Sequence, residues 1–197
     1  MKNFLSLLFI FFVIFIPADY CFASTVQEQL AGSINELLDI LKDPALQGED
    51  KIPERREALR KIIYERFDFA VTARLSLGRN WAQVNEEEKT IFVELFGTLL
   101  EQTYASKIES YTNEKVEFVK ERISGNKAQI NTRLIGDDME IFIDYRLYRE
   151  SEDKWRVFDI IVEGVSLVNN YRSQFSEILQ KDDFSTLIEK LREMTRE

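Results

Sequence analysis

The hydrophobic period of the chain changes near Tyr111, and this change is the strongest constraint on its fold. Before that residue, apolar side chains recur every three or four positions, which is typical of amphipathic helices. After it, apolar and polar side chains alternate, which is typical of strands with one buried face. The longest helical run has its apolar positions at Ile91, Phe92, Leu95, Phe96, Leu99, Leu100, Tyr104, Ile108 and Tyr111. Helices followed by strands favour an α+β domain.

Capping and breaking residues divide the helical part into several elements. Asn85 followed by Glu88 forms a capping box, so we expect the longest helix to begin there. Glycine at position 78 can close a shorter helix that starts near Phe67. Two earlier helices are expected over residues 26–41 and 53–67, since Pro53 suits a first helical turn.

The alternating part predicts strands over residues 116–118, 128–134, 141–147 and 155–162, separated by short turn sequences. Short connections make consecutive strands antiparallel neighbours. Helices are expected again over residues 165–179 and 184–194. The predicted architecture is therefore a curved, four-stranded antiparallel sheet with helices packed over one face.

The first 23 residues have the pattern of a secretory signal peptide. Lys2 precedes thirteen residues of which only Ser6 is polar, and small residues occupy the positions expected before a cleavage site after Ala23. A permanent bilayer span needs about 20 apolar residues. We therefore expect cleavage, with residues 24–197 released into the periplasm as a single domain. An uncleaved anchor and a lipoprotein acylated on Cys21 are the alternatives, although Tyr20 is bulky for the latter.

Composition excludes several classes of function. The chain has no histidine and one cysteine, which removes most nucleophile-and-base catalysis, zinc and haem sites, and disulfide frameworks. Its net charge is −9, so a nucleic-acid partner is not expected. No glycine-rich phosphate loop occurs, and neither Asp137-Asp138 nor Asp182-Asp183 matches a calcium loop. We expect no cofactor and no metal.

Two carboxylates interrupt apolar strands. Asp144 is interpreted as an outward-facing strand residue, and Asp159 as a buried structural carboxylate bonded to backbone or arginine. The alternative is a secreted enzyme of the cone-shaped α+β type that uses these carboxylates.

The remaining distinctive feature is apolar. Five large aromatic residues accompany the leucine and phenylalanine stripe: Tyr104, Tyr111, Tyr145, Trp155 and Tyr171. Such a stripe forms an ordinary core in most proteins, but a curved sheet with helices along one face can also enclose an apolar cavity. Periodicity leaves both interpretations open.

Two segments resemble a known family. The first contains a Leu-Gly-x-x-Trp block at residues 77–81, followed by the long helix, and the second contains Asp-x-x-x-Glu-Gly-Val-Ser at residues 159–166. Together they resemble the MlaC family of periplasmic phospholipid-binding proteins, auxiliary components of an ABC transport system that maintains outer-membrane lipid asymmetry. The resemblance extends over nearly all of residues 24–197.

The resemblance implies a nuclear-transport-factor-like cone that encloses an apolar cavity for the tails of a diacyl phospholipid. It also implies two partners: an inner-membrane ABC transporter with an MCE-domain protein, and an outer-membrane lipoprotein–porin complex. No chemistry on the lipid is implied. The residues expected to contact the lipid are Phe69, Leu75, Phe92, Phe96, Leu99, Tyr104, Ile141, Ile143, Tyr145, Leu147, Trp155, Val157, Ile161, Val165 and Val168. A secreted adaptor or chaperone with a filled core is the alternative.

Overall fold

The computed structural model describes residues 25–111, 114–137 and 139–196. The expected signal peptide lies outside the described residues and stays a prediction. The helices are α1 (Val26–Lys42), α2 (Ile52–Arg66), α3 (Phe69–Leu77), α4 (Glu86–Glu109), α5 (Leu167–Lys181) and α6 (Phe184–Met194), with short 3-10 turns at Pro44–Leu46, Glu49–Lys51 and Gly78–Gln83. The strands are β1 (Lys115–Ser124), β2 (Lys127–Ile135), β3 (Glu140–Ser151), β4 (Lys154–Val162) and β5 (Val165–Ser166).

The strands form one antiparallel sheet in the order β1-β2-β3-β4-β5. The predicted α+β class is confirmed, with one difference: β5 is a fifth strand at the position where a helix was expected to begin. Glu163 and Gly164 both have positive φ, which produces a tight hairpin turn back onto β4. Ser166 then caps α5 by accepting a hydrogen bond from the backbone N–H of Asn169.

The capping signals predicted the helix boundaries well. The Asn85 side chain accepts from the backbone N–H of Glu88 at 2.9 Å, and the Glu88 carboxylate accepts from the backbone N–H of Asn85 at 3.1 Å. This capping box begins α4 as expected. Gly78 ends α3 with a positive φ, also as expected.

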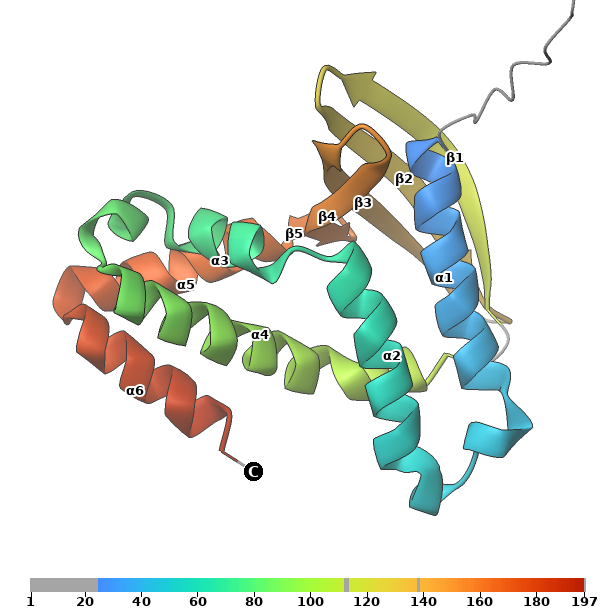
Figure 1. Ribbon diagram of the computed structural model, residues 1–197, viewed down its shortest axis with the longest axis horizontal. Helices are drawn as coiled ribbons and strands as arrows, with labels where there is room; N and C mark the ends of the chain where they lie inside the picture. Colours follow the sequence, from blue (N-terminus) through green and yellow to red (C-terminus); the bar gives the residue numbers. More distant parts are fainter. Residues whose placement is uncertain (1–24, 112–113, 138, 197) are drawn as a thin grey trace, which may run out of the picture.

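The helices divide into two groups (Figure 1). α3, α4, α5 and α6 form a bundle beside the sheet. α1 lies over one face of the sheet, and α2 runs beside α1 and reaches β4 at its C-terminal end. The bundle core is filled by the close-packed aromatic side chains Phe92, Phe96, Tyr171 and Phe175. A second core joins the start of α1 to the sheet through Val26, Leu30, Ile130, Leu147, Trp155 and Val157.

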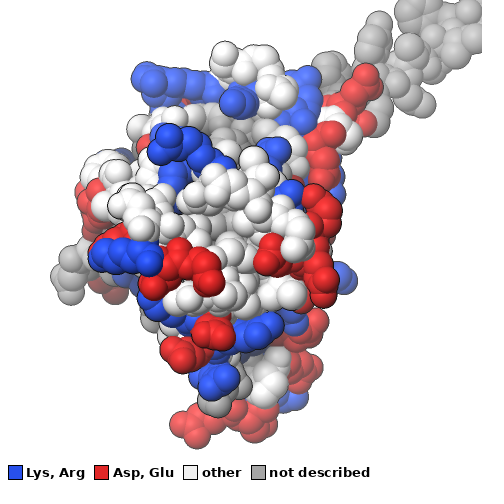
Figure 2. Space-filling model, turned by 90° about the vertical axis from the view of Figure 1, so that its left-hand side faces the viewer, with Lys and Arg blue, Asp and Glu red and all other residues white. Residues whose placement is uncertain are grey.

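The surface at the bundle end is mixed in charge. Figure 2 shows acidic and basic side chains interspersed with uncharged surface over this face. Among the described residues, no helix combines the length and hydrophobicity that a membrane span requires.

Asp159 connects the sheet to the bundle. Its side chain is 1% exposed and accepts hydrogen bonds from Ser166 Oγ at 2.7 Å and from the backbone N–H of Val168 at 3.0 Å. Arg146 on β3 pairs with it at 3.0 Å. The prediction of a buried structural carboxylate is confirmed, and its hydrogen bonds hold the β4–β5–α5 corner.

We expect Asp159→Ala to lower the free energy of unfolding by about 3 kcal/mol, because two buried donors lose a charged acceptor. Asp144→Ala is the control, since Asp144 is half-buried and accepts one side-chain bond, from Gln129 at 3.2 Å. It should cost about 1 kcal/mol or less. Urea denaturation measures both, and equal losses would contradict the assignment.

Candidate functional site

An apolar pocket of about 440 Å³ lies between α1, α2, the C-terminal half of α4 and the sheet face that α1 covers. Its walls are aliphatic and aromatic side chains. The helices contribute Leu30, Ile34, Leu37, Leu38, Leu41, Leu59, Ile62, Ile63, Phe69, Leu100, Tyr104, Ala105, Ile108 and Leu167. The sheet contributes Val116, Leu134, Ile143, Tyr145, Val157, Ile160, Val162 and Val165.

Helix α1 explains why this space is not filled. Val26 and Leu30 near its start are buried against the sheet, and Leu41 at its end is also buried. Ile34 and Leu37 between them lie on the same apolar stripe but are only half-buried. The middle turns of α1 therefore line an open apolar space rather than a close-packed core.

A bulge in β4 determines which sheet residues face the pocket. Tyr145 pairs with Ile160, yet Leu147 pairs with Val157, so β4 has one extra residue at this point. The extra residue shifts the alternation, and Val157 and Ile160 share the pocket face. Regular alternation predicted Ile161 there, but Ile161 pairs with Asp144 on the opposite face.

Six of the fifteen residues expected to contact a lipid line the pocket: Phe69, Tyr104, Ile143, Tyr145, Val157 and Val165. The bundle core, and not the pocket wall, contains Phe92, Phe96 and Leu99. The core beneath the start of α1 contains Leu147 and Trp155. The other four, Leu75, Ile141, Ile161 and Val168, lie outside the pocket wall. Lipid contact stays a prediction for all fifteen.

Sequence reasoning missed the walls contributed by α1 and α2. The apolar spacing of residues 26–41 predicted the helix, but it did not distinguish a stripe that faces a pocket from one that faces a core. The signal that was present is the continuation of this apolar stripe along the whole helix as far as Leu41.

Charged side chains join α2 to α4 at the edge of the pocket. Arg55 and Arg56 both contact the Glu109 carboxylate, at 3.4 and 2.9 Å, and Glu109 is 12% exposed. Arg60 contacts Glu101 at 3.4 Å. These pairs hold the two helices together where the pocket wall is otherwise apolar.

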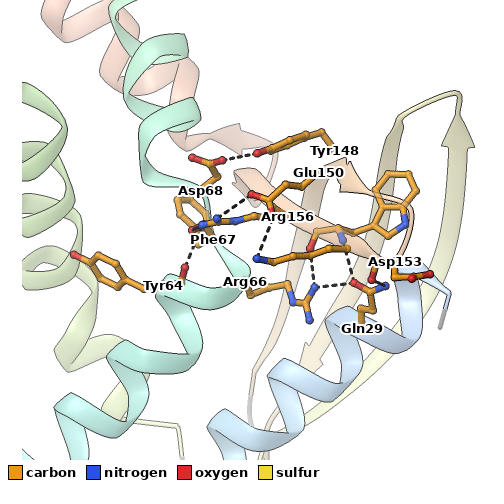
Figure 3. A network of polar contacts seen from close by, with 11 residues as sticks. Gln29, Tyr64, Arg66, Phe67, Asp68, Tyr148, Glu150, Asp153 and Arg156 are labelled. Atoms are coloured by element: carbon orange, nitrogen blue, oxygen red, sulfur yellow. Dashed lines mark hydrogen bonds and ion pairs between the residues drawn. The ribbon is translucent and has the colours of Figure 1, made fainter. Parts of the chain in front are cut away.

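A second polar network attaches α1 and the end of α2 to the sheet (Figure 3). The Arg156 guanidinium donates to the backbone carbonyls of Tyr64 at 3.1 Å and Phe67 at 2.7 Å. Arg66 donates to the Trp155 carbonyl at 2.6 Å and to Gln29 Oε1 at 3.0 Å. Arg156 of β4 thereby satisfies two carbonyls at the C-terminal end of α2.

Next to this network, Tyr148 donates to the Asp68 carboxylate (Figure 3). Burial and this hydrogen bond raise the pKa of Tyr148 to about 12. Burial also raises the pKa of Tyr104, Tyr111 and Tyr145. All four phenols keep their protons at neutral pH.

The described part of the chain holds no cluster of histidine, cysteine, aspartate or glutamate that could bind a metal ion. The pocket wall includes a few hydroxyl, guanidinium and carboxylate groups, and the rest of its lining is mostly hydrocarbon. Such a site can enclose apolar chains, with polar contacts at a few positions.

Comparison with known proteins assigns this chain to a family. The family model described as MlaC protein matches residues 32–193. The chain belongs to the MlaC family. Its sheet, bundle and covering helices are the family's architecture in this sequence.

Two curated relatives support this membership. The intermembrane phospholipid transport system binding protein MlaC of Haemophilus influenzae is 26% identical over 157 residues, which cover 74% of this chain and 72% of the relative. The toluene tolerance protein ttg2D of Pseudomonas putida is 22% identical over 163 residues, which cover 81% and 75% of the two chains.

A solved structure has the same fold. It is a phospholipid-binding protein from Ralstonia solanacearum in complex with a phospholipid, with a TM-score of 0.79 and 24% identity. The match covers 87% of this chain and 97% of that one.

We expect Arg156→Met to lower the free energy of unfolding by about 2 kcal/mol and to speed amide hydrogen exchange at the end of α2, because two backbone carbonyls lose a charged donor. Lys154→Met is the matched control. Lys154 pairs with Glu150, as Arg156 does, but it is 44% exposed, so its loss should cost about 0.5 kcal/mol or less. Faster exchange at α2 in both variants, or in neither, would contradict the anchoring role.

Proposed function

We propose that this MlaC-family protein is a periplasmic phospholipid carrier, which holds the acyl tails of a diacyl phospholipid in the apolar pocket. The pocket of about 440 Å³ between α1, α2, α4 and the sheet is the observation that carries the proposal. Ligand sites in proteins commonly measure about 300–1,000 Å³. The names of the Haemophilus and Ralstonia proteins, which refer to phospholipid transport and phospholipid binding, support this ligand class.

The energetics suit a carrier. Removing one methylene from water contributes about 0.8 kcal/mol, so two tails of about 30 methylenes would gain over ~20 kcal/mol. A lipid in a bilayer already has this burial. The pocket therefore needs only to match the bilayer, and the barrier that a carrier removes is the aqueous gap between membranes.

Delivery requires the pocket to open at a partner. In this proposal the partners are an inner-membrane ABC transporter with an MCE-domain protein and an outer-membrane lipoprotein–porin complex. The ion pairs of Arg55 and Arg56 with Glu109, and of Arg60 with Glu101, would separate if α2 moved away from α4. The net charge of −9 disfavours nonspecific binding to anionic membranes, which suits a shuttle.

We expect Ile34→Trp to reduce the lipid-bound fraction by roughly fivefold or more, because the added ring occupies space that the tails need. Native mass spectrometry of the periplasmic form, before and after organic extraction, measures this fraction. Asn35→Trp is the control, since Asn35 is exposed on the outer side of α1 and should leave lipid loading unchanged.

Equal loading of wild type and Ile34→Trp would place the lipid elsewhere than this pocket. Wild-type protein that purifies without lipid and takes up none from liposomes would contradict the carrier proposal. That result would favour a secreted adaptor.

A further inference from the structure

Four tyrosines line the pocket in the described part of the chain: Tyr64, Tyr104, Tyr111 and Tyr145. They place phenol hydroxyls in a wall that is otherwise largely hydrocarbon. Tyr64 is 38% exposed, and its phenol interacts with the Arg60 guanidinium. Tyr145 differs, because it stands on the central strand β3, beneath α1 and α2.

Tyr145 is surrounded by apolar side chains. Its cross-strand neighbours are Ile130 on β2 and Ile160 on β4, and it packs against the core that joins α1 to the sheet. Among residues 25–111, 114–137 and 139–196, no protein group hydrogen-bonds to its hydroxyl. Tyr148, three residues along the strand on the opposite face, has a partner in Asp68.

Tyr145 is half-buried and lines the pocket, so its hydroxyl meets whatever fills that space. When an apolar ligand displaces water there, a hydroxyl that gains no new partner is unfavourable. Burial raises the pKa of Tyr145 well above its usual range, and the nearby Tyr111 phenol raises it further. The Tyr145 hydroxyl therefore keeps its proton at neutral pH and presents a donor to the pocket. A ligand that carries an acceptor to this position would satisfy it.

The chemistry of a diacyl phospholipid indicates which acceptor that is. The tails contain none, and the phosphate is a strongly hydrated anion whose burial in a hydrocarbon wall would be costly. The two ester carbonyls lie between these parts and are neutral acceptors. They can enter an apolar pocket behind the tails and reach a phenol there.

We propose that the Tyr145 hydroxyl donates a hydrogen bond to an ester carbonyl of the bound lipid, so that the pocket selects ester-linked over ether-linked glycerolipids. This inference rests on the proposed function. Tyr145 acts in it as a specificity-determining residue, because an ether oxygen is a much weaker acceptor and leaves the hydroxyl unsatisfied.

The test is a competition between two lipids that differ only at this position. Vesicles contain equal amounts of dipalmitoyl phosphatidylglycerol and its dihexadecyl ether analogue. Delipidated protein is incubated with them, reisolated, and analysed by mass spectrometry for both lipids. We expect wild type to bind the ester lipid about three- to tenfold in excess, the range that one net hydrogen bond supports.

Tyr145→Phe removes only the hydroxyl, so its ester-to-ether ratio should fall to about one while it still loads lipid. Tyr148→Phe is the control on the same strand. It also removes one phenol hydroxyl, but Tyr148 lies outside the pocket wall and bonds to Asp68, so it should keep the wild-type ratio. A wild-type ratio near one, or a ratio that Tyr145→Phe leaves unchanged, would overturn the inference.

Two other outcomes differ from a change in the ester-to-ether ratio. Equal loss of both lipids in Tyr145→Phe would assign the residue to packing and would overturn the selectivity role. Failure of wild type to bind either lipid would overturn the proposed function itself, and the inference with it.

Discussion

The polar network between α1, the end of α2 and β4 is the attachment on which the pocket depends. Gln29 of α1 and Arg66 of α2 bond to the backbone of Trp155 on β4 and to each other. In the other direction, Arg156 of β4 donates to two carbonyls at the end of α2. Apolar packing alone would draw α1 onto the sheet along its whole length, because burial is non-directional. Directional hydrogen bonds at one end instead let the middle turns of α1 stand away from the sheet. The ion pairs of α2 with Glu109 complete the frame on the α4 side.

Because of the bulge in β4, side chains from this strand line the pocket on one face of the sheet and contact β5 and the start of α5 on the other. Before it, Val157 faces the pocket, and after it, Ile160 does, while Asp159 and Ile161 turn toward the other face. Asp159 then hydrogen-bonds to Ser166 and to the start of α5. The same backbone irregularity therefore shapes the pocket wall and fixes the helix bundle beside it. A regular strand would place the carboxylate on the pocket side, where it would have no donors from α5.

Features that depend on local chemistry could be predicted from the sequence. The change of period near Tyr111 predicted the α+β class, and the Asn85–Glu88 capping box predicted the start of α4. The division between core and pocket could not be predicted, because both present the same apolar spacing. Phe92 and Phe96 fill the bundle through contacts with Tyr171 and Phe175, which are far away in sequence. The shift at the β4 bulge is likewise a property of strand pairing.

The separation of a filled core from an open pocket is what allows one small domain to carry an apolar ligand. The aromatic bundle and the core beneath the start of α1 are close-packed and include the most deeply buried side chains, such as Phe92, Phe96 and Leu147. The pocket wall adds half-buried aliphatic residues such as Ile34 and Leu37, whose incomplete packing costs free energy that these cores must offset. A ligand that fills the space recovers part of this cost and stabilises the fold by linkage. In the proposed carrier, the same side chains would lower the stability of the protein without lipid and raise it once the tails fill the pocket.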